Sequence, residues 1–178
     1  VFKLNKTFIP QLSYPALKQQ IELKRLATIN AIDVADTVIA IRSEKLPDPK
    51  TLANAGSFFK NIAINQQQLD SFILKNPSAP YFQYNHSDSS DNIGYKIPAA
   101  WLIEQCGFKG AKSGHLGMHK QQALVLINYS GSETSPIDTT SSNPAPSATD
   151  VINFSEKIIA AVKQRFGFTL QREPQIIS

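Results

Sequence analysis

Two side chains of this sequence, a hydroxyl and a carboxyl, are candidates for chemistry. Ser57 follows an Ala-Gly pair where a turn leads into an extended segment, so its hydroxyl could be exposed and oriented by backbone donors. Glu173 lies between Arg172 and Pro174 near the end of the sequence. Considered singly, each has a simpler interpretation: a turn serine in the first case and a solvated surface carboxylate in the second.

A second group of side chains could bind an anionic or polar ligand. Arg42 and Lys45 precede a proline-rich segment, where they could clamp a phosphate or simply be solvated at the end of a helix. Gln122 begins the most apolar stretch of the chain, where its amide must find partners or could contact a ligand. His115 and His119 have a spacing that suits a metal pair, but nearby glycines disfavour a helix and no further ligand is evident, so we expect no metal site.

Composition and charge exclude several classes of protein. The 178 residues carry a net charge of +4, and residues 1–25 alone account for 5 − 1 = +4, so no basic stripe for nucleic acid runs along the rest of the chain. The longest apolar runs have about five residues, whereas a membrane-spanning helix needs roughly twenty. The single cysteine excludes an internal disulfide framework. We therefore expect a cytoplasmic protein with no nucleic-acid partner and no membrane contact.

The first part of the chain is expected to hold a strand, a helix and a domain boundary. Residues 1–5 alternate as a strand does, and residues 10–25 are weakly patterned. Val34, Val38 and Ile41 would line one face of a helix over residues 31–42. The prolines in residues 46–50 predict a rigid extended connector, which we take as the boundary. Both ends of the sequence look cut within strand-like segments, so we expect a piece of a longer protein.

The second part alternates irregularly between strand-like and helical segments, which favours an α+β fold without a βαβ repeat. The pattern predicts a strand beginning at Ser57, a helix over 66–75, a polar loop over 81–92 and a short helix over 98–106. A turn-rich stretch over 108–117 and a central strand over 122–128 should follow, and then a surface insertion over 130–149 that is rich in Ser, Thr and Pro. The last predicted elements are a helix capped by Thr149 that runs to Phe166, and strand pieces over 168–170 and 175–177.

Five motifs in one order resemble the UDP-N-acetylenolpyruvoylglucosamine reductases, which are also called UDP-N-acetylmuramate dehydrogenases. They are Arg42-Ser-Glu-Lys45-Leu-Pro-Asp-Pro-Lys50 with Asn54-Ala-Gly-Ser57-Phe-Phe-Lys-Asn61, then Ala99-Ala-Trp101-Leu-Ile, Gln105-Cys-Gly-Phe-Lys-Gly110, His119-Lys-Gln-Gln122-Ala-Leu-Val-Leu-Ile-Asn128, and Phe166-Gly-Phe-Thr-Leu170 followed by Glu173.

The resemblance implies a cytoplasmic flavoenzyme of peptidoglycan synthesis that is monomeric when complete. Such an enzyme uses NADPH to reduce FAD, and then reduces UDP-N-acetylglucosamine enolpyruvate to UDP-N-acetylmuramate. By this resemblance, residues 1–48 would end the second FAD-binding domain, residues 49–168 would form a two-layer substrate-binding domain with a sheet covered by helices on one face, and residues 169–178 would return to the first FAD-binding domain. FAD would be held mainly by domains outside this sequence.

The resemblance also implies roles for individual residues. Ser57 would donate a proton, and Glu173 would help to stabilise an enolate. Lys45 would bind the UDP diphosphate, Asn61 and Gln122 would contact the same ligand through their amides, and Arg42 and Lys96 would take a less defined part. The sequence departs from the family pattern at Ile62, His115 and Pro174.

Two other interpretations stay open at this stage. A UDP-sugar or nucleotide-binding module that has lost the chemistry would need the same ligand-binding residues, but it would not need Ser57 and Glu173 to meet. In a purely structural interpretation, Ser57 would be a turn serine and Glu173 a solvated carboxylate. The placement of these two side chains therefore separates the hypotheses.

Overall fold

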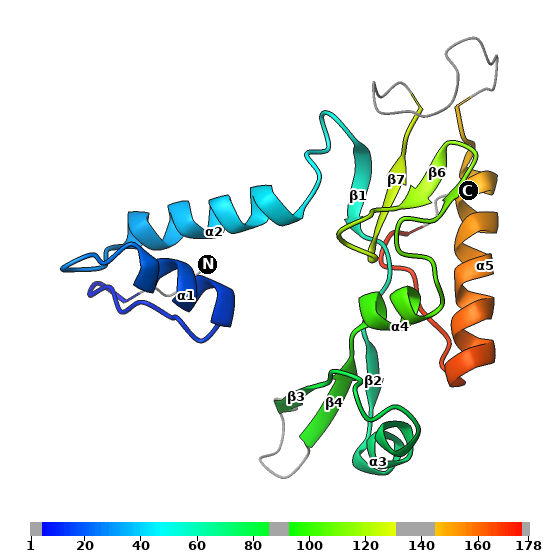
Figure 1. Cartoon of the computed structure of the whole chain (residues 1–178), viewed down its shortest axis with the longest axis horizontal. Helices are drawn as coiled ribbons and strands as arrows, with labels where there is room; N and C mark the ends of the chain where they lie inside the picture. Colours follow the sequence, from blue (N-terminus) through cyan, green and yellow to red (C-terminus); the bar gives the residue numbers. More distant parts are fainter. Residues whose placement is uncertain (1–4, 86–92, 131–144, 176–178) are drawn as a thin grey trace. The chain divides into compact units, whose positions relative to one another are not determined.

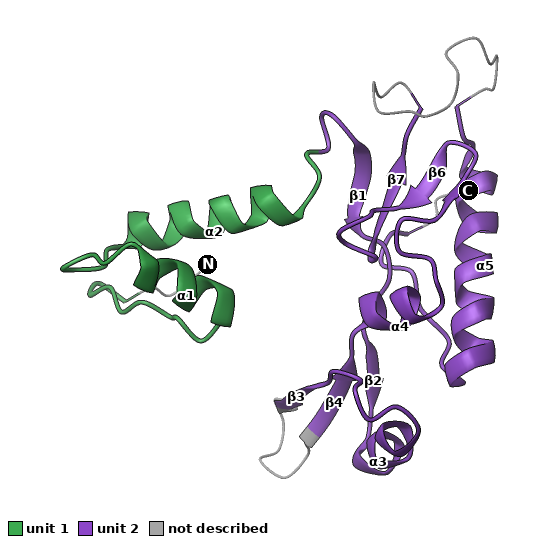
Figure 2. Ribbon diagram, viewed as in Figure 1, with its two compact units in different colours: residues 1–48 green, residues 49–178 purple. Residues whose placement is uncertain are grey.

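The computed structural model describes residues 5–85, 93–130 and 145–175 (Figure 1). The chain divides into two compact units, Val1–Asp48 and Pro49–Ser178, which Figure 2 distinguishes by colour and which are described separately below. Within the described ranges, no helix has the length and apolar character needed to cross a membrane.

The first unit is a pair of helices, α1 (Pro15–Leu23) and α2 (Ala31–Lys45). Their contact buries Leu17, Ile21 and Ile41. Helix α2 begins at a capping box, in which the Asn30 side chain accepts from the backbone of Asp33 and the Asp33 side chain accepts from the backbone of Asn30. It ends where Leu46 becomes extended in front of a proline, as the connector predicts.

The sequence-based expectations for this unit were only partly correct. The predicted helix over 31–42 is confirmed and extends further to Lys45, whereas α1 was not predicted because residues 10–25 show little periodicity. Val38 was expected on the buried face but is exposed, and Thr37 is buried instead, with its hydroxyl donating to the Asp33 carbonyl at 2.6 Å. The strand over 1–5 falls almost entirely on residues 1–4, which lie outside the described residues.

The second unit contains a four-stranded antiparallel sheet in the order β1-β7-β6-β5. Its strands are β1 (Ala53–Ser57), β5 (Lys112–Ser113), β6 (Leu116–Met118) and β7 (Val125–Asn128). Strand β7 lies between β1 and β6, so a central apolar strand is confirmed, but it begins at Val125 rather than at Gln122 as predicted. Helix α5 (Ala148–Phe166) packs against this sheet at β6 and ends at Gly167, whose φ of +76° is the left-handed conformation of a helix stop.

A smaller antiparallel sheet of three strands, in the order β2-β4-β3, stands apart from the first. It consists of β2 (Ile62–Ile64), β3 (Phe82–Asn85) and β4 (Ile93–Ile97), and helix α3 (Gln66–Lys75) packs against β4. Helix α4 (Ala99–Gln105) follows β4 directly. One continuous apolar core joins both sheets and the helices α3, α4 and α5.

The α+β class is confirmed, but the expected single sheet is two sheets. The helices over 66–75 and 98–106 are confirmed within a residue at each end. The strand expected to begin at Ser57 in fact ends there, residues 82–85 of the expected loop form β3, and α5 is capped by Ser147 rather than Thr149. Residues 168–170 form no strand. Residues 86–92, 131–144 and 176–178, which include most of the expected insertion, lie outside the described residues.

Candidate functional site

Ser57 is the last residue of β1 and is exposed. The pairing of β1 with β7 is regular at Asn54 but shifts before Ser57, which lies opposite Val125. Gly56 lies in the irregular segment with a φ of +74°, and its N–H donates to the Asn54 side chain at 2.9 Å. Such a bulge leaves a residue unpaired and bends the strand, so the regular pairing of β1 is interrupted just before Ser57.

The backbone of Phe58 connects Ser57 to two distant parts of the chain. Its N–H donates to the Leu124 carbonyl at 2.8 Å, and its carbonyl accepts from the N–H of Glu173 at 2.9 Å. The contact continues as an antiparallel bridge between Phe59 and Arg172. The structure therefore places the segment that carries Glu173 directly beside the end of β1, and both Ser57 and Glu173 are exposed there.

Arg172 points to helix α5. Its Nε donates to the Ser155 hydroxyl at 2.7 Å, and its guanidinium pairs with Glu156 at 2.5 Å. Ser155 is fully buried and donates in turn to the Ile152 carbonyl at 2.7 Å. Although Arg172 directly precedes Glu173 in the sequence, its guanidinium therefore attaches the segment that carries Glu173 to α5.

We expect replacement of Arg172 by methionine to destabilise the second unit by about 1.5–3 kcal/mol, the usual contribution of a hydrogen bond that involves a charged group. The substitution leaves the buried Ser155 hydroxyl without its donor. Urea unfolding would measure the loss. Lys109→Met is the matched control, because the ion pair of Lys109 with Glu104 is exposed and such pairs contribute at most about 1 kcal/mol. Equal losses in the two variants would contradict this account of Arg172.

Gln122 lies in the turn that leads into β7. Its carbonyl accepts from the N–H of Val125 at 3.0 Å, and Val125 is the residue opposite Ser57. The N–H of His119 donates to the Val125 carbonyl at 2.8 Å, which closes the turn from the other side. Gln122 is half-buried. The backbone segments that carry Ser57, Glu173 and Gln122 thus lie next to one another at one end of the β1–β7 pair.

The other ligand-binding candidates lie elsewhere. The Asn61 side chain accepts from the N–H of Ala99 at 3.0 Å, so it satisfies a free donor at the start of α4. Lys96 is exposed on β4, with its ammonium 4.7 Å from the centre of the Tyr84 ring. Arg42 and Lys45 belong to the last turn of α2 in the first unit.

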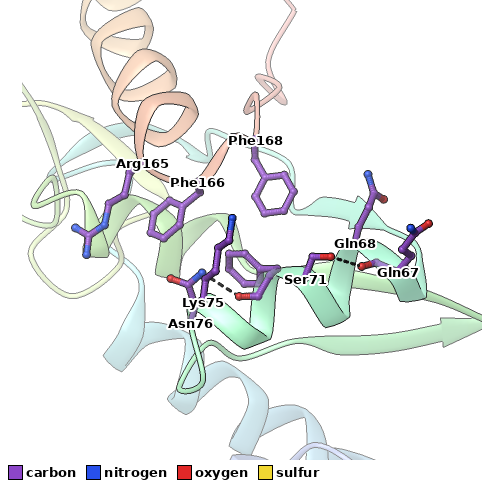
Figure 3. A pocket seen from close by; sticks show the side chains of 10 residues that line it. Gln67, Gln68, Ser71, Lys75, Asn76, Arg165, Phe166 and Phe168 are labelled. Carbon is purple, nitrogen blue, oxygen red and sulfur yellow. Dashed lines mark hydrogen bonds between the residues drawn. The ribbon is translucent and has the colours of Figure 1, made fainter.

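The structure also contains a cavity of about 730 Å³ that the sequence did not indicate (Figure 3). It is lined by α3 and by the end of α5, with Lys75 and Arg165 beside the rings of Phe166 and Phe168. None of the predicted site residues lines it. A smaller cavity of about 250 Å³ borders the candidate site, where Phe58, Arg172 and Pro174 form part of its wall.

Burial shifts the titration of several groups in the second unit. It lowers the pKa of His119, and the charge of Lys120 lowers it further. It raises the pKa of Tyr129, and it raises that of Cys106 against the opposing effect of Arg165. In the described ranges, no group of at least three His, Cys, Asp or Glu side chains could hold a metal ion.

The fold and the site define an α+β domain in which an exposed hydroxyl and an exposed carboxylate lie on adjacent segments at the end of a strand. Residues 48–142, more than half of the chain, match the family model described as the UDP-N-acetylenolpyruvoylglucosamine reductase C-terminal domain. The chain belongs to this family.

Relatives of the same name extend over nearly the whole chain. The UDP-N-acetylenolpyruvoylglucosamine reductase of Porphyromonas gingivalis is 41% identical over 166 residues, which are 93% of this chain and 43% of the relative. That of Photobacterium profundum is 38% identical over 97% of this chain and 43% of its own length. That of Alcanivorax borkumensis is 39% identical over 98% of this chain and 44% of its own length. The chain therefore spans less than half the length of these relatives.

Proposed function

We propose that this chain supplies the substrate-binding domain and the proton donor of an NADPH- and FAD-dependent UDP-N-acetylmuramate dehydrogenase of peptidoglycan synthesis. The observation that carries the proposal is the hydrogen bond between the N–H of Glu173 and the Phe58 carbonyl, 2.9 Å long. It brings the two residues that the chemistry requires to adjacent segments, although they are far apart in the sequence. Family membership supplies the substrate class.

The substrate, UDP-N-acetylglucosamine enolpyruvate, carries a vinyl ether conjugated to a carboxylate. FAD, once bound and reduced by NADPH, would supply a hydride to the terminal carbon of the double bond. The negative charge then gathers on the carboxylate oxygens as an enolate, which needs fixed hydrogen-bonding or positive groups around it. The adjacent carbon, which bears the ether oxygen and the carboxylate, takes up a proton to complete the reduction.

Ser57 is the proposed donor of that proton, because its hydroxyl is exposed at the end of β1. Glu173 is proposed to help stabilise the enolate from the adjacent segment. A carboxyl group can take that part only when it is protonated or paired with a cation. The guanidinium of Arg172 is occupied by Ser155 and Glu156, so we assign that pairing to no residue of this segment.

Five further residues are proposed to bind the substrate. Lys45 would hold the diphosphate through charge-assisted hydrogen bonds, with Arg42 in a supporting part. Gln122 would contact the same ligand from the turn beside Ser57, and Lys96 would contribute from β4. Asn61 would do so through its side-chain N–H groups, since its side-chain oxygen already accepts a hydrogen bond from Ala99.

We propose that FAD is held mainly by other domains of the complete, monomeric, cytoplasmic enzyme. In this proposal the first unit ends the second FAD-binding domain, and residues 169–178 return to the first. The first unit exposes many large apolar side chains for a pair of helices, which supports its packing within a larger domain. They are Phe8, Ile9, Tyr14, Leu23, Leu26, Ile32, Val38 and Ile39.

Anaerobic reduction of the complete enzyme by NADPH, followed by addition of the enolpyruvyl substrate, tests this function. We expect the flavin absorbance to return as the substrate is reduced. A UDP-sugar-binding module without the chemistry would bind the substrate and leave the flavin reduced. The approach of Glu173 to the end of β1 supports the enzyme, because binding alone does not require it.

We expect Glu173→Ala to slow the reoxidation of the flavin by about 10²- to 10³-fold, the usual effect of removing a group that stabilises developing charge. Reduction by NADPH should keep its rate. The side chain is exposed and its backbone bond to Phe58 is retained, so folding should be little affected. Glu104→Ala, another exposed glutamate, is the matched control. Wild-type reoxidation in Glu173→Ala would remove Glu173 from the mechanism.

A further inference from the structure

The turn between β6 and β7 is organised around one buried histidine. His119 follows the last residue of β6 and is only 6% exposed. Its Nδ1 accepts from the N–H of Gln122 at 3.2 Å and lies 3.4 Å from the N–H of Gln121, which also donates to it. The imidazole therefore satisfies two backbone donors that the turn would otherwise leave unpaired.

These bonds fix the backbone of Gln122 on both sides. Its N–H is bound by the imidazole of His119, and its carbonyl is bound by the N–H of Val125. The N–H of His119 also donates to the Val125 carbonyl at 2.8 Å. Because Val125 lies opposite Ser57, the imidazole determines where the Gln122 side chain starts relative to the end of β1.

The hydrogen bonds also define the state of the imidazole. A ring nitrogen can accept a hydrogen bond only through a free lone pair, so Nδ1 carries no proton and the ring is neutral with its proton on Nε2. Burial and the charge of Lys120 lower the pKa of His119, which favours the same neutral form. The lone pair of Nδ1 faces the turn, so this nitrogen is not available to a metal or to the substrate.

We propose that His119 is a positioning residue for Gln122, and that the acceptor at its δ position holds the turn in the shape that presents the Gln122 amide beside Ser57. The claim that the Gln122 amide is presented to the substrate rests on the proposed function. His119 contacts neither the substrate nor the reacting atoms in this account. It acts through the backbone of the residue that does.

Three variants separate the acceptor from the bulk of the ring. His119→Asn places an oxygen close to the position of Nδ1, so it can still accept from the turn. His119→Gln moves its oxygen one bond further out, and His119→Leu fills the space without an acceptor. Circular dichroism of all three establishes that they fold. If His119 only fills space, the size of the effect should follow the volume of the replacing side chain. If Nδ1 acts as an acceptor, His119→Asn alone should behave like the wild type.

Amide hydrogen exchange in the full chain tests the local part without any reference to function. We expect the N–H of Gln122 to exchange about five- to tenfold faster in His119→Leu and His119→Gln, the change that corresponds to the loss of one hydrogen bond. The asparagine variant should keep the wild-type rate. Equal exchange rates in all the proteins, or equally fast exchange in all three variants, would overturn the role of the δ acceptor.

Steady-state kinetics of the complete enzyme test the link to the substrate. We expect KM for the enolpyruvyl substrate to rise about tenfold in the leucine and glutamine variants, with kcat and the rate of flavin reduction much less affected, and to return towards wild type in His119→Asn. Faster exchange with an unchanged KM would overturn the positioning of the substrate contact. If the wild-type enzyme does not turn over the enolpyruvyl substrate, the proposed function is overturned, and so is the proposed effect of His119 on substrate binding. The exchange rates would still decide whether His119 holds the turn.

Discussion

Replacement of Ser57 by alanine is expected to slow the reoxidation of the reduced flavin by about 10²- to 10⁴-fold, the range of a missing general acid. Reduction of the flavin by NADPH should keep its wild-type rate, because no proton from Ser57 is needed in that half of the reaction. The two half-reactions can be followed separately by anaerobic stopped-flow absorbance. Slower reoxidation together with an unchanged rate of reduction is the result that identifies a proton donor to the substrate.

The structure indicates that this substitution will leave the fold intact. The Ser57 side chain is exposed, and the segment is held by backbone bonds from Phe58 to Leu124 and Glu173 that alanine retains. Ser113→Ala is the matched control, since Ser113 is an exposed serine on β5 of the same sheet. We expect wild-type rates in both half-reactions for the control.

Three results would contradict the role of Ser57. Unchanged reoxidation would show that another group delivers the proton. A loss in both half-reactions would indicate a general disturbance of the protein rather than a missing acid. Weaker substrate binding with unchanged reoxidation at saturation would make Ser57 a binding residue, because uniform binding alters KM and leaves kcat unchanged.

The helices of the second unit could be predicted from local signals in the sequence. Helix α3 begins after Asn65 and ends before Asn76-Pro77, and α5 ends at Gly167 in the left-handed conformation. These signals act within a few residues, so they are visible in the sequence. In the first unit, helix α1 could not be predicted in this way, because its buried residues Leu17 and Ile21 are recognised only through their packing with Ile41.

The short strands could not be predicted in the same way. Strands β2, β3 and β4 form one antiparallel sheet. Strand β2 has only three residues, β3 contains polar residues and β4 contains a glycine, so none of them shows a clear strand pattern. The sheet is stabilised by pairing between its strands and by packing of β4 against α3, which no local pattern records. Segments that pair over long separations are the ones that sequence patterns describe least well.

The candidate site shows the same division. The resemblance to a family singled out Ser57, Glu173 and Gln122, and the structure adds that Phe58 binds the backbone on both sides, at Leu124 and at Glu173. It also shows that the guanidinium of Arg172, the residue before Glu173, bonds to α5. The hydrogen bonds of the His119 side chain within the turn could not be predicted, because the sequence shows only the spacing of His119 from His115. That spacing suggests a metal site and not a turn.

The largest effect on stability is expected at Phe59, which is 1% exposed and lies in the core that joins both sheets. Phe59→Ala should lower the free energy of unfolding of the second unit by about 3–5 kcal/mol, because it removes a buried ring and leaves a cavity. The loss includes an edge-to-face contact with Phe58, whose ring centre is 5.1 Å away. The free energy of unfolding of a typical domain is only about 5–15 kcal/mol in total, so the variant should be marginally folded.

Trp101 makes this prediction measurable for the second unit alone. It is the single tryptophan of the chain, it is partly buried against the same core, and its ring contacts Phe72 and Phe166. Its fluorescence during urea unfolding therefore reports on this core and not on the helix pair of the first unit. A lower midpoint with an unchanged dependence on urea would show a loss of stability without a change in the surface exposed on unfolding.

Phe82→Ala is the control for the same chemical change outside the core. Phe82 is 59% exposed on β3, so its truncation should cost less than about 1 kcal/mol. Phe59→Leu, which keeps most of the volume, should fall between the two and remain measurable if Phe59→Ala does not fold. Equal losses at Phe59 and Phe82 would contradict the assignment of Phe59 to the shared core. We expect the loss of unfolding free energy to decrease in the order Phe59→Ala, Phe59→Leu, Phe82→Ala. This order would show that Phe59 contributes strongly to the stability of the second unit through its packing in the core. The backbone of the same residue pairs with Arg172, next to the candidate site.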